Sequence, residues 1–392
     1  MQQNVVFLLL DIIGLGLLVK WSYLQVKAYK ITANKKAFFS FKRFKFPLLI
    51  LVVISIPLLL VNSTNFEEAF HINANNLQQN SLYYAILLSF CISFVWLLYI
   101  YKIDVFEKEQ KRYILLIILL SSIFTLFAEV PYNLLHHIGF TNTEHPLQSF
   151  LYCIFGIGFI EETIKFIPLL IILKFTKAID EPYDYIFYAS ASALGFAFIE
   201  NAMYLYSHGI DIINARALYA TVAHMTFSSV IGYGLFLTTH KKTKFPAGIV
   251  FLIMYLLSMV SHGFYDFWLI NEAVAEYSGL TTLFFLATVH IWFVMKNNTL
   301  NNSNYYKKSI RIDNDRIKVY LIFSLLGLFM CSYLYVALVW NAFEANIFFI
   351  KSAFAYGYIL LYLIATLSRF NLIEGILKPI RLSISFLFPK LK

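Results

Sequence analysis

Long apolar runs alternate with short polar connections along this chain. Eleven runs can be distinguished, each close to the length of about 20 residues that one helix needs to cross a bilayer. A membrane β-barrel would instead show alternating segments of about ten residues. Helices are the other way to satisfy backbone polar groups in lipid, so the sequence predicts an all-α, polytopic transmembrane helical bundle. The runs are 4–24, 46–62, 81–101, 113–131, 147–173, 184–206, 218–239, 246–270, 277–295, 317–340 and 345–368.

The basic residues of the connections support this count. Connection 26–45 holds seven Lys and Arg residues and connection 63–80 holds none, and rich and poor connections keep alternating to the tail that begins at Arg369. Among the poor connections described by this alternation, 207–217 carries one basic residue, Arg216. Because basic loops stay in the cytoplasm, we expect eleven spans with the N-terminus outside and the C-terminus in the cytoplasm.

Composition narrows the class of protein further. Apolar residues make up 60% of the 392 residues, charged residues make up 14%, and the mean hydropathy is +0.69. These values exclude an ordinary soluble domain, a disordered chain and a nucleic-acid-binding module. The net charge of +9 is interpreted as loop orientation, and the three cysteines show no pairing or CxxC pattern. The lipid bilayer is therefore an expected partner, and nucleic acid is not.

Ionisable residues at membrane depth are the strongest functional signal, because each costs about 2.5–3.5 kcal/mol on insertion scales. They are concentrated between 147 and 270, whereas the other predicted helices carry scattered single ones. We therefore place the functional site in this part of the chain. The concentrated residues are Glu161, Glu162, Lys165, Glu200, His224, His262 and Asp266.

Their spacing predicts a shared cavity. Glu161 and Lys165 are one helical turn apart on one face, as are His262 and Asp266. Under the predicted topology, Glu200, His224 and His262 lie within about 3 Å of one another in depth. Glu161 lies deeper unless its helix starts later, tilts or enters as a re-entrant segment. We expect these helices to present their side chains to one outward-leaning cavity.

Such a cavity suggests hydrolysis. Two adjacent carboxylates cannot both stay ionised in a low dielectric without compensation, which Lys165 and a divalent cation can supply. Zinc with two histidines and a glutamate is a known hydrolytic arrangement, and here the candidate ligands are His224, His262 and Glu200. Glu161 or Glu162 is then the general base. A metal-free alternative, in which a glutamate held by lysine and histidine activates water, stays open.

Two further polar residues have predicted supporting roles. Asp266 is placed to orient the ring of His262 as a carboxylate behind the metal ligand. Asn201, next to Glu200, could hold an oxyanion or a substrate carbonyl.

The motifs EExxK (Glu161, Glu162, Lys165), FxxxE (Phe196, Glu200) and HxxxD (His262, Asp266) occur in this order on consecutive apolar segments. This pattern resembles the PrsW family of intramembrane proteases, over about 147–270. The resemblance implies hydrolysis of peptide bonds in membrane-associated proteins, with first-site cleavage of a membrane-anchored anti-sigma factor as a typical role. It also implies a location in the bacterial cytoplasmic membrane.

The chain is predicted to have four regions: a four-helix segment of unknown role (1–131), the catalytic core (147–270), three further helices (277–368) and a basic amphipathic cytoplasmic tail (369–392). The polar stretch 297–316 is predicted to be a flexible linker. Three alternatives remain open: a CAAX-type or bacteriocin-processing protease of the same clan, a proton-coupled transporter, and a non-catalytic membrane scaffold.

Overall fold

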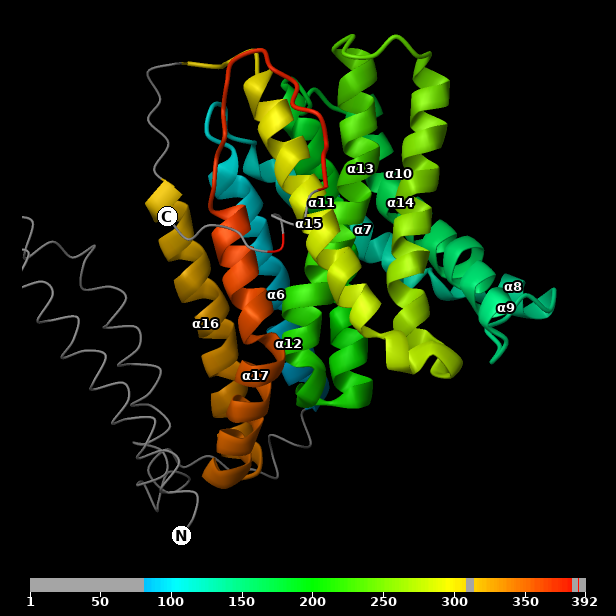
Figure 1. Cartoon of the computed structure of the whole chain (residues 1–392), viewed down its shortest axis with the longest axis vertical. Helices are drawn as coiled ribbons and strands as arrows, with labels where there is room; N and C mark the ends of the chain where they lie inside the picture. Colours follow the sequence, from blue (N-terminus) through cyan, green and yellow to red (C-terminus); the bar gives the residue numbers. More distant parts are fainter. Residues whose placement is uncertain (1–80, 308–313, 383–386, 388–392) are drawn as a thin grey trace, which may run out of the picture. The chain divides into compact units, whose positions relative to one another are not determined.

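The computed structural model describes residues 81–307, 314–382 and 387, so the predicted runs 4–24 and 46–62 lie outside the described residues. The described part is helical, with no strand in it (Figure 1). Its elements are α6 (Ser81–Ile103), α7 (Lys111–Leu126), α8 (Glu129–His137), α9 (Pro146–Leu151), η1 (Tyr152–Gly158), α10 (Phe159–Phe175), α11 (Pro182–His208), η2 (Ile210–Ile212), α12 (Ile213–Ala215), η3 (Arg216–Ala220), α13 (Thr221–Thr239), α14 (Ala247–Ile270), η4 (Glu272–Tyr277), α15 (Gly279–Asn301), α16 (Asn314–Val339) and α17 (Ala342–Leu367).

Eight helical segments of the described part are long and apolar enough to cross a membrane. They coincide with the predicted runs from 81–101 onward, with the exception of 147–173. The all-helical membrane fold is therefore confirmed. The number of eleven spans, the orientation of the termini and the four-region division stay predictions.

The predicted run 147–173 is not one regular helix. It consists of α9, which begins at Pro146, then the π-helical turn η1, then α10. Gly158, at the end of η1, explains why this segment can pack so closely against α14, because a Cβ at Gly158 would lie 2.5 Å from the backbone oxygen of Met259. A Cβ at Gly263 would similarly lie 2.6 Å from the backbone of Cys153. Glycines on both sides thus bring the glutamate pair of α10 next to His262 of α14.

Helices α11 and α13 form the interior of the larger compact unit. In their most apolar stretches 78% and 83% of the residues are buried, against 28% in α14. α11 packs against α6, α7 and α13, and α13 packs against α14 and α15 (Figure 1). A buried helix can carry acidic and imidazole side chains toward neighbouring helices rather than toward lipid, which is what a polar site inside a membrane requires.

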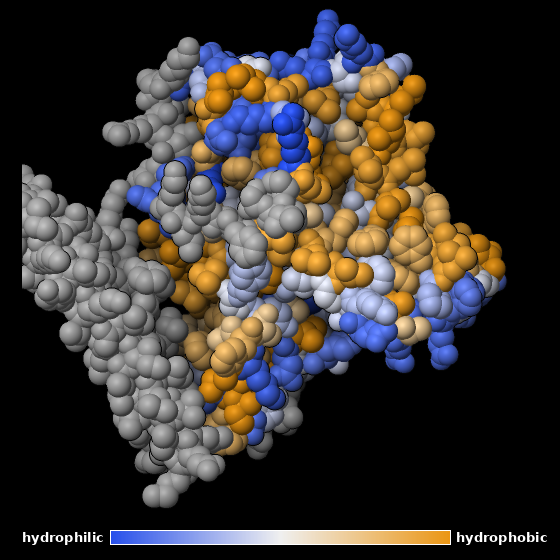
Figure 2. Space-filling view, viewed as in Figure 1, coloured by the Kyte–Doolittle hydropathy of each residue, from blue (hydrophilic) through white to orange (hydrophobic). Residues whose placement is uncertain are grey.

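Apolar side chains cover the exposed sides of the helices at the upper right of Figure 2, where α13 and α14 lie, whereas hydrophilic residues gather at the loops above them. Exposed apolar residues on α14 include Leu252, Ile253 and Leu257. This distribution is typical of helices whose outer faces meet lipid.

The last turn of α15 differs from the predicted flexible linker. Residues 297–301 are helical, and the side chains of Asn297, Asn298 and Asn301 accept hydrogen bonds from the backbone of Asn371, Lys378 and Ile373, respectively. The prediction is wrong for these residues because the asparagines find backbone partners in the tail, which runs across the end of the bundle as the red loop of Figure 1.

The described residues fall into two compact units. The larger contains Asn80–Ser332 and Lys351–Lys392, and the smaller includes Tyr333–Ile350. Within the smaller unit, the hydroxyl of Tyr333 donates a 2.8 Å hydrogen bond to Oδ1 of Asn346, which joins the end of α16 to the start of α17. The candidate site lies entirely in the larger unit.

Candidate active site

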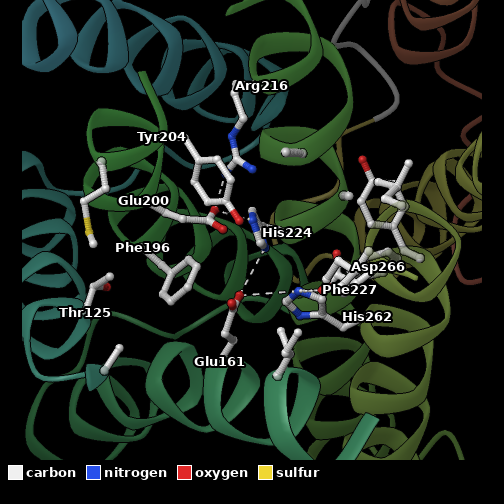
Figure 3. A pocket seen from close by; sticks show the side chains of 18 of the residues that line it. Thr125, Glu161, Phe196, Glu200, Tyr204, Arg216, His224, Phe227, His262 and Asp266 are labelled. Atoms are coloured by element: carbon white, nitrogen blue, oxygen red, sulfur yellow. Dashed lines mark hydrogen bonds and ion pairs between the residues drawn. The ribbon is translucent and has the colours of Figure 1, made fainter. Parts of the chain in front are cut away.

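A cavity of about 740 Å³ lies among α7, α8, α10, α11, α13 and α14. Figure 3 shows its polar side chains pointing toward one another from several helices. Glu161, Glu200, His224, His262 and Asp266 all line it. The predicted convergence of the four motif-bearing helices is therefore observed, and Glu161 reaches the same level as the histidines.

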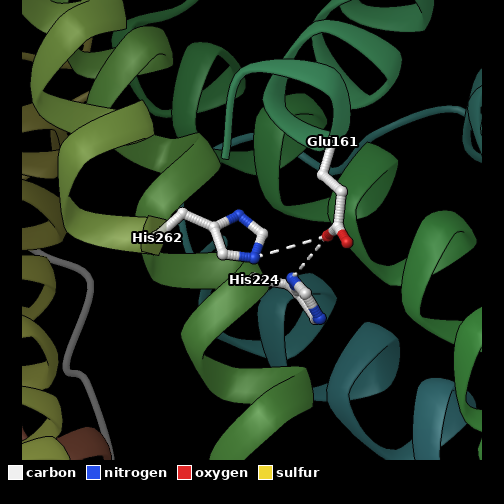
Figure 4. A group of neighbouring side chains, drawn as sticks. All are labelled: Glu161, His224 and His262. Carbon is white, nitrogen blue, oxygen red and sulfur yellow. Dashed lines mark ion pairs between the residues drawn. The ribbon is translucent and has the colours of Figure 1, made fainter. Parts of the chain in front are cut away.

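Glu161, His224 and His262 form the closest group of metal-ligand types in this cavity. One donor atom of each lies within 4.8 Å of those of the other two, and all three residues are buried (Figure 4). Oε2 of Glu161 lies 3.4 Å from Nε2 of His262 and 3.9 Å from Nδ1 of His224. The other carboxylate oxygen of Glu161 accepts a 3.2 Å hydrogen bond from the hydroxyl of Tyr132.

The two adjacent glutamates have different surroundings. Glu162 is fully buried and does not line the cavity. Its Oε2 accepts hydrogen bonds from the hydroxyls of Ser228 (2.8 Å) and Ser258 (2.9 Å), and its Oε1 lies 2.9 Å from Nδ1 of His262. The carboxylate of Glu162 is thus saturated by the protein, whereas that of Glu161 faces the open space.

Lys165 links this group electrostatically. Its ammonium lies 2.9 Å from Oε1 of Glu162 and 3.3 Å from Oε2 of Glu161. It also lies 2.9 Å from Nδ1 of His224, and 4.2 Å above the ring of Phe196. The motif residues Lys165 and Phe196 therefore contact each other across α10 and α11.

The hydrogen bonds assign a ring nitrogen of each histidine to a carboxylate. Nε2 of His224 donates to Oε2 of Glu200 at 2.8 Å, because Nδ1 of the same ring accepts from Lys165. Nδ1 of His262 faces Glu162 at 2.9 Å, which leaves Nε2 toward Glu161. Each ring therefore holds one nitrogen against a carboxylate, as metal-ligating histidines typically do, and turns the other toward Oε2 of Glu161.

Glu200 is predicted to be a metal ligand and Asp266 the carboxylate behind His262, and the structure shows what each of them contacts. Glu200 contacts Nε2 of His224. It does not belong to the group whose donor atoms lie within 4.8 Å of one another, in which Glu161 is the carboxylate. Asp266 lies 3.3 Å from Nε2 of His262, the nitrogen that also faces Glu161. Glu162, at 2.9 Å from Nδ1, is the carboxylate that holds this ring from behind.

Asn201 lies beside the cavity rather than in it. Its amide nitrogen donates to the hydroxyl of Thr221 at 2.9 Å, and its oxygen accepts from Nε of Arg216 at 2.6 Å. Because both ends of the amide are engaged and the residue is fully buried, Asn201 positions Arg216 in this structure.

Arg216 is the main site residue that the sequence reasoning missed. It lines the cavity, forms an ion pair with Glu200 and stacks over the ring of Tyr204 (Figure 3). Arg216 is the single basic residue of the connection 207–217, which is predicted to lie outside. Because outer connections are usually poor in Lys and Arg, this exception was the signal available in the sequence. Ser228, Ser258 and Tyr132 were also missed, because hydroxyls on apolar helices have no distinctive spacing.

A divalent cation fits the donor set and the charge of the site. Four carboxylates, those of Glu161, Glu162, Glu200 and Asp266, face two fixed cations, Lys165 and Arg216, so two negative charges remain when the histidines are neutral. Nδ1 of His224 cannot serve both Lys165 and a cation. Binding of a cation therefore requires the ammonium of Lys165 to stay paired with Glu162 and to give up its contact with Nδ1 of His224.

Two π-helical turns adjoin the site. η1 ends two residues before Ile160 and leads directly into the glutamate pair, and η3 contains Arg216 and precedes the helix that carries His224. Such turns are rare and are frequently found at functional sites, because the inserted residue redirects the side chains that follow.

Comparison with known proteins shows which family the site-bearing part of the chain resembles. Residues 109–295 match the family described as "PrsW family intramembrane metalloprotease", a range that contains all the cavity-lining residues. This part of the chain is similar to the PrsW family. The resemblance inferred from the three motifs is thereby confirmed, and it extends beyond 147–270 into α7 and α15. With its eight candidate spans, the chain is an integral, multi-pass protein of a bacterial membrane.

Several curated relatives carry the name Protease PrsW. The one from Oceanobacillus iheyensis is 32% identical over 149 residues, which are 37% of this chain and 64% of that protein. The one from Geobacillus kaustophilus is 34% identical over 127 residues (32% and 55%), and that from Bacillus subtilis 34% over 123 residues (30% and 54%). The chain thus spans between about half and two thirds of the length of these relatives. No solved structure matches it.

Proposed function

We propose that this protein is an intramembrane peptidase that hydrolyses peptide bonds of membrane-anchored protein substrates with the help of a divalent cation. The observation that carries the proposal is the group formed by Glu161, His224 and His262, whose donor atoms lie within 4.8 Å of one another at the wall of a buried cavity. The PrsW-family match of the same residues supports it.

Glu161, His224 and His262 would hold the cation, and two nitrogens with one carboxylate oxygen make zinc the expected metal. When bound, such a cation polarises a carbonyl oxygen and makes a bound water nucleophilic near neutral pH. Glu200, which lines the same cavity, would accept a proton there as the general base. The Arg216 guanidinium, paired with Glu200, supplies positive charge where negative charge develops on the substrate carbonyl.

The remaining motif residues position these groups. Glu162 holds the ring of His262 and is itself fixed by Ser228, Ser258 and Lys165. Removing the charge of Lys165 would leave two adjacent carboxylates with one fewer compensating cation, which is costly in a low dielectric. The glutamate pair thus divides into one residue that meets the reacting atoms and one that maintains the geometry.

The surroundings of the cavity suit a segment leaving the membrane. Leu126 and Met203 line it and are 64% and 62% exposed, and Leu269 is also exposed. An apolar rim around a polar cavity accepts the end of a transmembrane helix, whose scissile amide can then reach the polar groups. With the predicted orientation the cavity leans toward the outer surface, so we expect cleavage near the outer end of the substrate helix, as for a membrane-anchored regulator such as an anti-sigma factor.

The test is cleavage of single-span reporter proteins, tagged at both ends, by the full chain reconstituted in proteoliposomes. We expect Glu161→Gln to abolish cleavage and His262→Ala and Glu200→Gln to reduce it strongly, with a chelator inactivating the wild type and zinc restoring it. Glu276→Gln, a change at an exposed position of the 3₁₀ turn η4 before α15, serves as the matched carboxylate control. Cleavage by Glu161→Gln at the wild-type rate would overturn the proposal.

A further inference from the structure

A second group of acidic residues lies away from the cavity, where the connection between α6 and α7 meets the start of α11. We call Asp104, Glu107, Glu109, Glu181 and Asp184 the acidic rim. None of them lines the cavity, and none belongs to the three motifs. The turn between α6 and α7 is seen in cyan near the top of Figure 1.

Three members of the acidic rim converge on one point. One carboxylate oxygen from each of Glu107, Glu109 and Asp184 lies within 4.8 Å of the other two. The outer oxygens are fixed: the hydroxyl of Tyr188 donates to Oε2 of Glu109 at 2.5 Å, and Oδ2 of Asp184 accepts two backbone N–H groups at 2.7 and 2.8 Å. These bonds hold the carboxylates in place while leaving their second oxygens toward the group.

Apart from a contact between the carboxyl groups of Glu109 and Asp184 themselves, the second oxygens have no hydrogen-bond partner within the described part of the chain. They are Oε1 of Glu109, Oδ1 of Asp184, Oε1 of Glu181 and both carboxylate oxygens of Asp104. All four residues are at least 95% buried, and Asp104 is completely so, within electrostatic range of Glu107, Glu181 and Asp184. Buried acceptors of this kind are normally paired with protein, water or an ion.

A structural role explains only part of the acidic rim. Asp184 forms a capping box with Glu181 at the start of α11, which accounts for one oxygen of Asp184. A helix start needs one or two acceptors, whereas five carboxylates gather here. Lys108 is the nearby cation, but its ammonium donates to the backbone oxygens of Tyr101 and Asp104.

We propose that the acidic rim binds one hard divalent cation, Mg²⁺ or Ca²⁺, through Glu107, Glu109 and Asp184, with Asp104 and Glu181 completing the charge around it. The donors are all carboxylate oxygens with no nitrogen or sulfur among them, the set that Mg²⁺ and Ca²⁺ prefer and that separates this site from the histidine-containing cavity. The cation joins the α6–α7 connection to α11. α11 carries Phe196 and Glu200, and α7 walls the cavity, so the site stabilises the scaffold of the active site without entering the chemistry.

The test is Tb³⁺ binding to the full chain in detergent after removal of bound metals. Tb³⁺ is a hard oxygen-seeking ion, and Tyr188, bonded to Glu109, is placed to sensitise its luminescence. We expect a saturable tyrosine-sensitised signal that Ca²⁺ or Mg²⁺ displaces, and the more effective competitor identifies the preferred ion. In Glu109→Gln/Asp184→Asn the affinity should fall at least about tenfold.

Two further variants separate this proposal from the proposed peptidase. Glu161→Gln, which removes a ligand of the cavity, and Glu276→Gln should both keep the wild-type Tb³⁺ signal. Loss of cleavage with retained Tb³⁺ binding, or the reverse, shows that the two sites are independent. An unchanged affinity in the double variant, or no displacement by either Mg²⁺ or Ca²⁺, would overturn the second site.

A milder variant covers the case in which the double variant does not fold. Glu107 is half-buried and takes no part in the capping box, so Glu107→Gln preserves the helix start. We expect addition of the preferred ion to raise the thermal unfolding temperature of the wild type and to raise that of Glu107→Gln markedly less. Equal rises in both proteins would show that the ion binds elsewhere.

Discussion

The cavity and the acidic rim are both built from buried carboxylates, but they are compensated in different ways. In the cavity, Lys165 and Arg216 pair with Glu162 and Glu200, and two serines fix the other oxygen of Glu162, so that the carboxylate of Glu161 is the one facing the open space. In the acidic rim, buried oxygens of Asp104 and Glu109 have no such partner in the described chain. The protein's own cations and hydroxyls thus fix most of the cavity and leave Glu161 for the proposed cation, whereas we propose that the acidic rim takes its compensating charge from solution.

The largest effect should come from Glu161, whose carboxylate faces the open space of the cavity. Glu161→Gln keeps the shape and one hydrogen-bonding oxygen but removes the charge that would face a cation or water. We expect the turnover rate for a reporter substrate to fall by at least about 100-fold. Size-exclusion elution and the thermal unfolding temperature should stay close to those of the wild type, because the glutamine keeps the shape of the side chain and an oxygen that can accept the hydrogen bond from Tyr132. A variant with normal turnover would contradict the assignment.

Glu162→Gln should act through the histidine rather than through the reacting atoms. Since Glu162 lies 2.9 Å from Nδ1 of His262, its loss should weaken zinc binding by about 10–100-fold. Asp266→Asn is the matched comparison, because Asp266 contacts the same ring at the longer distance of 3.3 Å. Competition with a chromogenic zinc chelator measures both. A larger effect for Asp266→Asn than for Glu162→Gln would restore Asp266 as the orienting carboxylate.

Arg216→Gln tests whether the cavity needs its second cation. The change leaves the Glu200 carboxylate without its ion pair and removes positive charge from the substrate side of the cavity. We expect turnover to fall by about tenfold or more while zinc content stays near the wild-type level, since Arg216 does not contact the three ligand candidates. Arg216→Lys should recover part of the rate. Loss of zinc in Arg216→Gln would instead assign the residue to metal binding.

The smallest effect concerns the acidic rim. Removing hard cations with a chelator selective for Ca²⁺ or Mg²⁺ should lower the thermal unfolding temperature by a few degrees, because a ligand that binds the folded state adds stability by mass action. Glu109→Gln/Asp184→Asn should not respond to the chelator. If wild type and variant respond alike, the difference between the two acidic groups lies in something other than a bound ion.

How much of the fold and of the site could be predicted from the sequence depended on the kind of signal. The apolar runs from 81–101 onward correspond to helices because insertion in lipid depends on the length and hydropathy of a local segment. The seven ionisable residues between 147 and 270 could be found because each is costly at membrane depth. Their order on the chain was enough to suggest the PrsW family, which the family match confirms.

Which member of each pair faces the cavity could not be deduced from spacing. The π-helical turn η1 inserts an extra residue before α10, and one residue rotates all following side chains by about 100° around the axis. Glu161 and Glu162 are one residue apart, so this rotation decides which of them faces the cavity and which is buried against Ser228 and Ser258.

By itself, the sequence determined the helical membrane architecture and the residue types available for chemistry, since both follow from local composition. Only the tertiary structure decided that Arg216 enters the cavity, that Asn201 lies behind it, and that Asp104, Glu109 and Asp184 meet at the acidic rim. These relations join residues far apart on the chain or on separate helices. They depend on how each helix is rotated and how closely it packs, which the glycines at 158 and 263 and the π-helical turns set.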